Sequence, residues 1–213
     1  MPEAAGRDAI LEAAIAEFAS KGYHEANTNA IRERAGVSKG LVFHHYGSKA
    51  ALYMAALERA EAMLGERMSS YGYPGGGNLF ETIADATAAK LRASIELPEA
   101  YRLVFGAYVD APAELAAELR ARLASAIAAS RETLGRALDA TGLAPGTDRG
   151  RALDLVCACV RGLADDYVER YRAMSPAEAL ERIGEARDEL AGMIALLGSG
   201  ILARDGGAAR PSP

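Results

Sequence analysis

Basic and polar side chains gather in one short stretch of this chain, residues 27–50. The stretch holds four basic residues and a single acidic one, Glu33, so its local net charge is +3, whereas the whole chain has a formal net charge of −5. The basic residues are Arg32, Arg34, Lys39 and Lys49. Lysine and arginine neutralise phosphates, and an acidic remainder turns the rest of the molecule away from them. The charge pattern therefore favours contact with a nucleic acid through this stretch.

Caps and glycines divide the stretch into two short helices. Polar residues 27–29 begin the first helix, which ends at Gly36, and Ser38 caps a second helix over residues 39–46. Gly47 ends that helix, and Ser48 caps the one that follows. An apolar helical pattern over residues 7–20 precedes them. Three helices with a glycine turn form the layout of a helix-turn-helix, whose second helix enters the major groove of DNA by its N-terminal end.

The second of these helices has side chains suited to reading base edges. Val42 is expected to face the core. The residues expected to face the groove are Lys39, Gly40, Leu41 and His44. Gly40 lets the backbone approach DNA closely, and Lys39 is a candidate for contacting guanine. Lys49 stands at the start of the next helix, where a phosphate is favoured.

Residues 28–53 resemble the signature of the tetracycline-repressor (TetR) family of transcriptional regulators, over about a quarter of the chain. The signature couples an Ile-Ala-x-x-Ala-Gly-Val-Ser turn to a Leu-Tyr-x-His/Tyr-Phe recognition helix and a Ser-Lys-x-x-Leu start of the next helix. The corresponding residues here are 31–38, 42–46 and 48–52. The resemblance implies an all-helical homodimer whose variable C-terminal domain binds a small molecule. Ligand binding would swing the fourth helix and separate the two DNA readers.

The resemblance also implies which residues contact DNA. They are Thr28, Asn29, Arg32, Ser38, Lys39, Gly40, Leu41, Phe43, His44, His45, Tyr46 and Lys49. Of these, Thr28 and Lys49 are expected to contact phosphates. Phe43, His45 and Tyr46 are expected to pack or to contact the DNA backbone.

Two positions depart from the family pattern. Arg32 stands where a small residue is usual, so it either reaches a phosphate or disturbs packing. Phe43 stands where tyrosine is usual and lacks a hydroxyl that bonds a phosphate in the family. That loss is worth roughly 1 kcal/mol at most, and His45 or Tyr46 could substitute for it.

A break in the middle of the chain separates two functional parts. Residues 69–78 contain Pro74 and three consecutive glycines, which cannot continue a helix. Beyond them, helical patterns cover residues 79–97, 101–110, 114–138, 148–172 and 176–204, so we predict an all-α fold of about nine helices. The predicted parts are a helix-turn-helix DNA-binding domain at 1–50, a connecting fourth helix at 51–70, a ligand-binding and dimerisation domain at 78–204, and a disordered tail at 205–213.

The last two predicted helices carry apolar seams with a 3-4 spacing. The seam residues are Leu153, Val156, Val160, Leu163 and Tyr167, then Leu180, Ile183, Leu190, Ile194, Leu197 and Ile201, with Arg187 at one seam position. Such seams pack helices at shallow angles. They form either the interior of one subunit or an interface between two copies. Because helix-turn-helix repressors usually act as dimers, we predict a homodimer through these two helices.

Aromatic residues mark the expected ligand pocket. They are Tyr101, Phe105, Tyr108, Tyr167 and Tyr171. The spacing of the first three puts their rings on one helix face. The five residues form either ordinary core or the lining of a cavity for a small organic ligand, with tyrosine hydroxyls to orient it.

No metal, cofactor or catalytic site is expected. His44 and His45 are adjacent and point about 100° apart on a helix, and His24 is the only other histidine. Cys157 and Cys159 also point apart, so they are buried core thiols or, as the minor alternative, redox-sensing thiols. No nucleophile–base pair or phosphate-binding loop is legible, so an enzyme is not expected.

The sequence therefore predicts a DNA-binding transcriptional regulator, a repressor that a small molecule releases from a near-palindromic operator. The alternative is a helical protein–protein adaptor that does not bind DNA, and the intact basic stretch argues against it. The first residues do not resemble a secretion signal, and no apolar run approaches the roughly 20 residues of a membrane helix. A cytoplasmic protein without membrane contact is expected.

Overall fold

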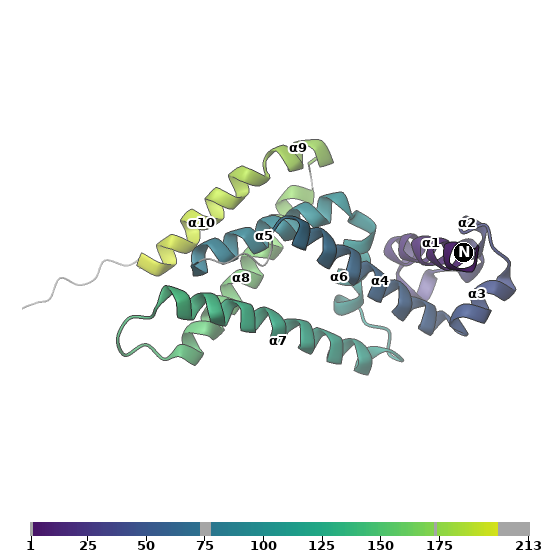
Figure 1. Cartoon of the computed structure of the whole chain (residues 1–213), viewed down its shortest axis with the longest axis horizontal. Helices are drawn as coiled ribbons and strands as arrows, with labels where there is room; N and C mark the ends of the chain where they lie inside the picture. The colour runs from purple at the N-terminus through teal and green to yellow at the C-terminus, as the bar shows by residue number, and fades with distance from the viewer. Residues whose placement is uncertain (1, 73–77, 173, 200–213) are drawn as a thin grey trace, which may run out of the picture.

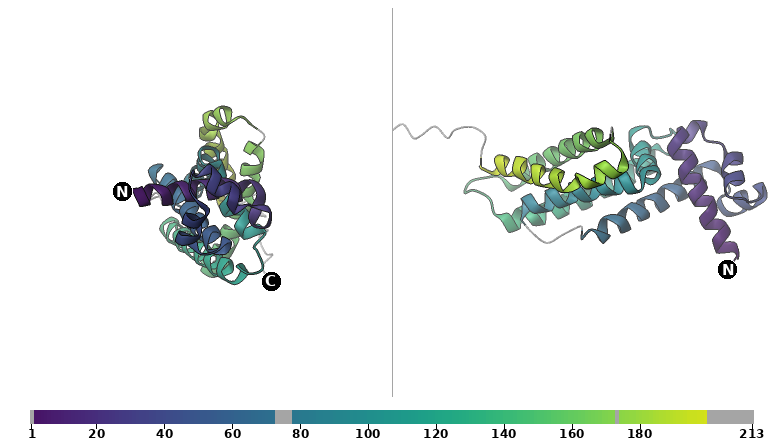
Figure 2. Two further views of the ribbon diagram at one scale, coloured as in Figure 1. Left: turned by 90° about the vertical axis from the view of Figure 1, so that its right-hand side faces the viewer. Right: turned by 90° about the horizontal axis from the view of Figure 1, so that it is seen from above.

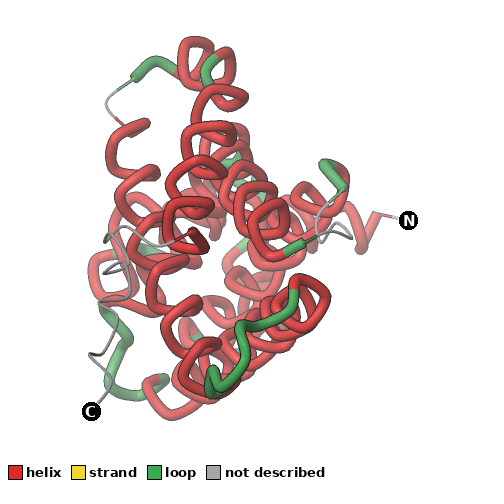
Figure 3. Tube along the Cα trace, turned by 90° about the vertical axis from the view of Figure 1, so that its left-hand side faces the viewer, coloured by secondary structure: helices red, strands yellow, loops and turns green. Residues whose placement is uncertain are grey.

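The computed structural model describes residues 2–72, 78–172 and 174–199, and this part of the chain forms ten helices and no strand (Figure 1, Figure 3). The helices are α1 (Pro2–Glu25), α2 (Thr28–Arg34), α3 (Lys39–Tyr46), α4 (Lys49–Ser70), α5 (Leu79–Glu96), α6 (Pro98–Val109), α7 (Ala116–Thr141), α8 (Arg149–Arg172), α9 (Pro176–Glu181) and α10 (Ile183–Ser199). The all-α class predicted from the sequence is confirmed. Residues 73–77 of the predicted break, and the predicted tail, lie outside the described residues. None of the described helices is long and apolar enough to cross a membrane.

The described helices number ten where the sequence predicted about nine, because the last predicted helix is two helices. α9 ends at Glu181 and α10 begins at Ile183, with Arg182 between them. Tyr171 of α8 donates its hydroxyl to the Arg182 carbonyl oxygen at 3.1 Å, beside the hydrophobic cluster that buries Ile183. The apolar spacing of one segment does not reveal a partner from another helix, so the pattern suggested one continuous helix.

α1 is longer than predicted at both ends, and it contains a break at Gly22. This residue has φ 71° and ψ 178°, a conformation that residues with a side chain rarely adopt. The glycine therefore interrupts the helix where the sequence predicted its end.

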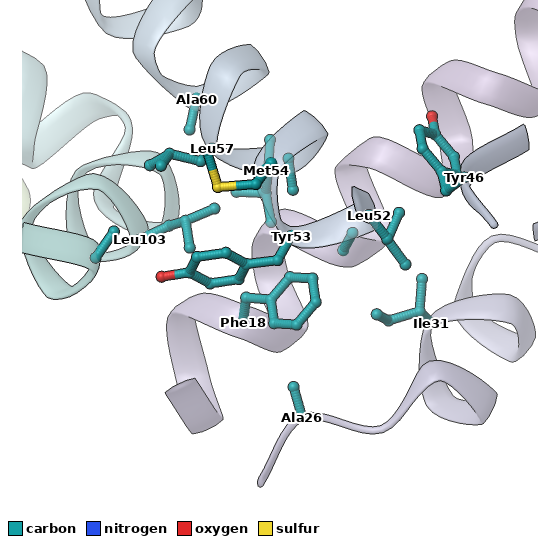
Figure 4. Close-up of a cluster of buried hydrophobic side chains, with 14 of the residues drawn as sticks. Phe18, Ala26, Ile31, Tyr46, Leu52, Tyr53, Met54, Leu57, Ala60 and Leu103 are labelled. Carbon is teal, nitrogen blue, oxygen red and sulfur yellow. The ribbon is translucent and has the colours of Figure 1, made fainter. Parts of the chain in front are cut away.

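One hydrophobic core joins the first four helices to α6 and the start of α7 (Figure 4). Phe18 of α1, Ile31 of α2 and Leu52 of α4 are at most 2% exposed. Phe18 also packs edge-on against Tyr53, with ring centroids 4.9 Å apart. Leu103 of α6 belongs to the same core, so the helices that hold α3 are packed onto the body of the molecule.

α5 is the central helix of the C-terminal part and contacts α4 and every helix from α6 to α10. Figure 1 shows α10 and α7 on either side of it. Figure 2 shows α1, α2 and α3 at one end of the molecule and the end of α10 at the other. The candidate DNA-reading helix thus lies far from the C-terminal body and is joined to it through α4 and α6.

Four of the predicted seam residues are buried within the chain, whereas Ile201 and the side chains of Leu163, Tyr167 and Leu197 lie outside the described residues. Leu153, Ile183, Leu190 and Ile194 are each at most 5% exposed. Arg187, at its seam position, donates its Nε–H to Asp85 of α5 at 2.7 Å. These residues form the interior of one subunit, the first of the two alternatives. Other apolar residues of α8 and α10 stay exposed, namely Leu155, Met193 and Leu196.

Candidate nucleic-acid interface

A buried carboxylate of α1 positions the start of α2. The Asn27 side chain caps α2 by accepting from the Asn29 N–H at 2.8 Å. The Asn27 N–H donates to Glu17 Oε1 at 3.0 Å, and Lys21 Nζ donates to the same oxygen at 2.8 Å. Burial raises the pKa of the Glu17 carboxyl, but the hydrogen bonds and the charge of Lys21 outweigh burial and leave this pKa below its usual value. Glu17 is therefore ionised and fixed beneath the loop that precedes α2.

Sequence interpretation missed Glu17. A glutamate within the buried run of residues 13–18 needs a partner, and Lys21 stands four positions later on the same helix. The position of Glu17 within an apolar run and the lysine four residues later could both have been read from the sequence.

Serine caps define α3 and α4, as the sequence predicted. Ser38 Oγ accepts from the Leu41 N–H at 3.2 Å, and Ser48 Oγ accepts from the Ala51 N–H at 3.0 Å. Gly36 has φ 67° in the turn between α2 and α3. The two caps therefore determine where the candidate reading helix begins and where the connecting helix follows.

α3 turns one side to solvent. Val42 is 4% exposed and anchors the helix to the core, as predicted. Leu41 is partly buried beside Gly6 of α1. The Lys39 ammonium lies 5.9 Å from the centre of the Phe43 ring, which is 42% exposed. The exposed residues of the predicted set on this helix and its cap are Ser38, Lys39, Gly40, Phe43 and His44.

Gly40 is not required by the fold. A Cβ placed on it would lie 3.9 Å from Ser38 Oγ, which is an ordinary van der Waals distance. Its φ is not positive either, so an alanine would adopt the same backbone. The missing side chain at this exposed position therefore leaves room for a partner outside the chain.

Two residues of the predicted set pack into the protein. Tyr46 is 9% exposed and belongs to the N-terminal core, and burial raises the pKa of its hydroxyl. His45 is partly buried, with its Nε2 atom shielded from solvent. Packing is one of the two roles that the sequence left open for them.

Arg32 lies along the surface of α2 and does not disturb packing. Its Nε donates to Asn29 Oδ1 at 3.3 Å and its Nη2 to Glu33 Oε1 at 3.1 Å. The side chain is 33% exposed. Thr28 is partly buried at the first position of α2. The start of α2 thus presents polar side chains with a cation beside them.

Lys49 is engaged with α1 in this structure. Its Nζ donates to the His24 carbonyl oxygen at 3.0 Å and lies 5.1 Å from the centre of the Tyr23 ring. These contacts hold the start of α4 against the end of α1. A phosphate contact by Lys49 would compete with them.

The aromatic residues predicted to line a ligand pocket belong to two helices, three to α6 and two to α8. Tyr101 and Phe105 stack on α6 with ring centroids 6.0 Å apart, and Phe105 is 45% exposed. Tyr108 and Tyr171 each use their hydroxyl in a hydrogen bond within the chain. The side chain of Tyr167 lies outside the described residues.

Titratable side chains of the described residues form no group of three or more that could hold a metal ion. Cys157 and Cys159 are free thiols, and both are partly buried. Neither cysteine lies near α2 or α3 in the chain's fold, because both belong to α8.

Residues 10–56 match a family model described as bacterial regulatory proteins, tetR family. The HTH-type transcriptional activator FasR of Mycolicibacterium smegmatis is 42% identical over 59 residues, which are 28% of this chain and 27% of that protein. The HTH-type transcriptional repressor AcnR of Corynebacterium efficiens is 38% identical over 66 residues, 31% of this chain and 35% of that protein. The aligned residues thus span only about a quarter to a third of these curated relatives.

Solved structures match over most of the chain. A TetR-like transcriptional regulator from Rhodococcus sp. RHA1 has a TM-score of 0.69 at 20% identity, covering 92% of this chain and 96% of that one. The regulator FadR from Bacillus subtilis, in complex with stearoyl-CoA, has a TM-score of 0.64 at 15% identity, covering 87% of this chain and 97% of that one. At these identities the likeness shows a shared fold.

Proposed function

The amino-terminal helices of this chain belong to the TetR family of bacterial regulatory proteins, and from that premise we propose that the chain is a sequence-specific transcriptional repressor. The observation that carries the proposal is the exposed side of α3, which presents Lys39, Gly40 and His44 and has no acidic residue. A lysine and a glycine at the start of a short helix suit entry into the major groove of DNA.

DNA contact is divided between reading and positioning. Lys39, Gly40, Leu41 and His44 face the groove, with Lys39 placed to contact guanine. The positioning contacts to the DNA backbone come from Thr28, Asn29, Arg32, Ser38, Phe43 and Lys49. His45 and Tyr46 support α3 from the side of the core. Residues 1–50 form the DNA-binding domain, and residues 51–70 connect it to the remainder.

The C-terminal part, residues 78–204, binds a small organic ligand and forms a homodimer through α8 and α10. Two exposed apolar residues of α10, Met193 and Leu196, support the dimer, since they are neighbours on one helix face and apolar side chains that gather on a surface mark interaction sites. A two-fold dimer presents two copies of α3 to a near-palindromic operator. The complex of the Bacillus subtilis neighbour with stearoyl-CoA supports a ligand for this fold. The curated relatives include an activator and a repressor. Release from the operator by a ligand is the behaviour of a repressor, so we propose that role for this chain.

A gel-shift titration with the DNA upstream of the chain's own gene tests the proposal. We expect a shifted band that unlabelled specific DNA removes and that scrambled DNA of equal length does not. Affinity should fall with salt, because phosphate contacts release counterions. Absence of any sequence-specific shift would sink the proposal and favour the adaptor that does not bind DNA.

A further inference from the structure

A cavity of about 440 Å³ lies in the C-terminal part between α5, α8 and α10, and the loop between α7 and α8 forms one of its walls. Binding sites for small molecules commonly have volumes of about 300–1,000 Å³. Of the aromatic residues predicted from the sequence to line a pocket, Tyr101, Phe105, Tyr108 and Tyr171 are not among its described lining residues. The cavity is therefore a separate candidate from the one that the sequence suggested.

The described residues of the cavity lining carry no charged side chain. Fifteen described residues form it, and the side chains with a polar atom are Thr141, Thr147 and Cys159. The Thr141 hydroxyl is already occupied, since it donates to the Ala137 carbonyl oxygen at 2.8 Å and accepts from the Leu79 N–H at 2.7 Å. A charged group placed in this cavity would lose water and gain no ion pair.

The inner wall of the cavity is part of a packed cluster. Ile83, Leu138 and Ile194 line it and are at most 4% exposed. At its edge, Leu143 is 37% exposed and Leu155 is 64% exposed. A rigid apolar wall with exposed leucines at the edge favours an apolar guest, because the guest removes this surface from water.

We infer that this cavity binds a neutral, apolar small molecule. On the proposed function, on which this inference rests, that molecule is the ligand that controls operator binding. α5 connects the two sites, because it lines the cavity at one end and pairs with α4 at the other, where Arg67 Nη1 lies 3.2 Å from Glu96 Oε2.

Two fluorescent probes with the same aromatic skeleton test whether the cavity prefers a neutral, apolar molecule to a charged one. N-phenylnaphthylamine is neutral, and anilinonaphthalenesulfonate carries an added sulfonate. We expect the full-length protein to bind the neutral probe at least about tenfold more tightly than the sulfonate. Equal affinities, or no saturable binding of the neutral probe, would overturn the inference.

A pair of tryptophan variants tests the location. Ala144 lines the cavity and is exposed in the loop after α7, whereas Ala140 is exposed on α7 and does not line it. Ala144→Trp should weaken binding of the neutral probe at least about tenfold, and Ala140→Trp should leave it within about twofold of the unchanged protein. The same affinity for both variants would place the probe elsewhere and overturn the assignment.

Cys159 supplies a reporter inside the cavity. In a Cys157→Ser variant it is the single remaining thiol, and it is one of the lining residues. The neutral probe should slow the reaction of Cys159 with a maleimide in proportion to probe occupancy. If raising the protein concentration alone gives the same protection, a second copy of the chain covers the cavity and the inference fails.

The operator gel shift, run on the same samples without probe, keeps the two proposals apart. Operator binding without binding of the neutral probe refutes the cavity alone. Probe binding that meets these criteria, without any operator binding, refutes the proposed repressor and leaves the cavity as a site.

Discussion

Among single residues, Gly40 best separates the needs of folding from those of DNA contact. Gly40→Ala adds one methyl group at an exposed helical position, 3.9 Å from Ser38 Oγ and without a closer contact outside the local backbone. Alanine is the better helix former by roughly 1 kcal/mol, so the melting temperature should rise. Against a DNA groove the same methyl group overpacks the contact, and operator affinity should fall by about tenfold. Thermal unfolding and a titration of labelled operator measure the two effects.

Gly65 of α4 is the matched control for Gly40. It is also exposed and helical, with open space where a Cβ would lie. Gly65→Ala should raise the melting temperature by a similar amount and leave operator affinity unchanged. If both variants bind the operator equally well, the prediction that Gly40 lies close to DNA is wrong.

Lys49 tests whether a contact within the free protein gives way to a phosphate. Each phosphate contact contributes about one unit to the slope of log affinity against log salt concentration. Lys49→Ala should therefore weaken binding to all DNA sequences and lower this slope by about one unit. Arg120→Ala, an exposed cation of α7, should leave the slope unchanged. If the Lys49→Ala protein keeps the salt slope of the unchanged protein but melts at a lower temperature, Lys49 serves to hold α1 against α4 through the His24 carbonyl oxygen.

Glu17 predicts a pH dependence of stability. Its carboxyl has a pKa in the folded protein below the usual value of 4.5. The ionised form is favoured in the folded state, so its stabilising contribution is complete above 4.5 and is lost as the pH falls through the lowered folded pKa. Glu17→Gln keeps an acceptor for the Asn27 N–H and removes the charge that pairs with Lys21. The melting temperature of the variant should thus fall less than that of the unchanged protein as the pH is lowered below 4.5, and parallel curves would contradict this role.

Among the helices, α4 carries the connection between DNA contact and the C-terminal part. Glu61 of α4 accepts from the Tyr108 hydroxyl of α6 and, at 3.0 Å, from Arg122 Nη1 of α7. Both side chains of the Glu61–Arg122 pair are 31% exposed, so the pair itself adds little stability. Its position, across three helices, makes it suited to holding the orientation of α4. Burial and the hydrogen bond to Glu61 raise the pKa of Tyr108, so its hydroxyl remains a donor at neutral pH.

Arg122→Ala should loosen α4 and lower the population of the orientation that binds DNA. We expect operator affinity to fall by roughly threefold to tenfold with the protein still folded. Arg136→Ala is the control, because its partner Glu132 lies on the same helix, α7, and the pair links no other element. Operator titrations and thermal unfolding of both variants measure the difference. Equal operator affinities for the two variants would exclude the pair as a link between α4 and the C-terminal part.

How far the sequence predicted these elements depends on how local their causes are. Ser38 and Ser48 cap the helices that follow them through contacts three residues away, so the pattern revealed both boundaries. The bend at Arg182 depends on the Tyr171 hydroxyl, 11 positions earlier on another helix, and no single segment contains that information. The candidate cavity draws on α5, α7, α8 and α10, and its apolar lining looks like ordinary core in the sequence. Local signals therefore located the candidate DNA-reading helix and did not locate this cavity.

At the scale of the whole molecule, operator binding depends on how two copies are joined. Leu153 of α8 and Ile183, Leu190 and Ile194 of α10 are buried within one chain, so these seam residues are not available to a dimer. Met193 and Leu196 of α10 are 39% and 57% exposed, which provides apolar surface for the pairing outside the cavity. A dimer gives the second copy of α3 a high effective concentration at its half-site once the first is bound.

Leu196→Glu should therefore change both the assembly and the affinity. A charge buried between two copies has no partner, so sedimentation should show a shift from dimer to monomer. Operator affinity should then fall by about 100-fold or more, since avidity of this kind contributes factors of about 10²–10⁴. Val109→Glu, at a valine of α6 that is 72% exposed, is the control and should leave assembly and affinity unchanged. A Leu196→Glu protein that remains dimeric would show that the two copies meet elsewhere, whereas a monomer with full operator affinity would show that a single α3 suffices for recognition.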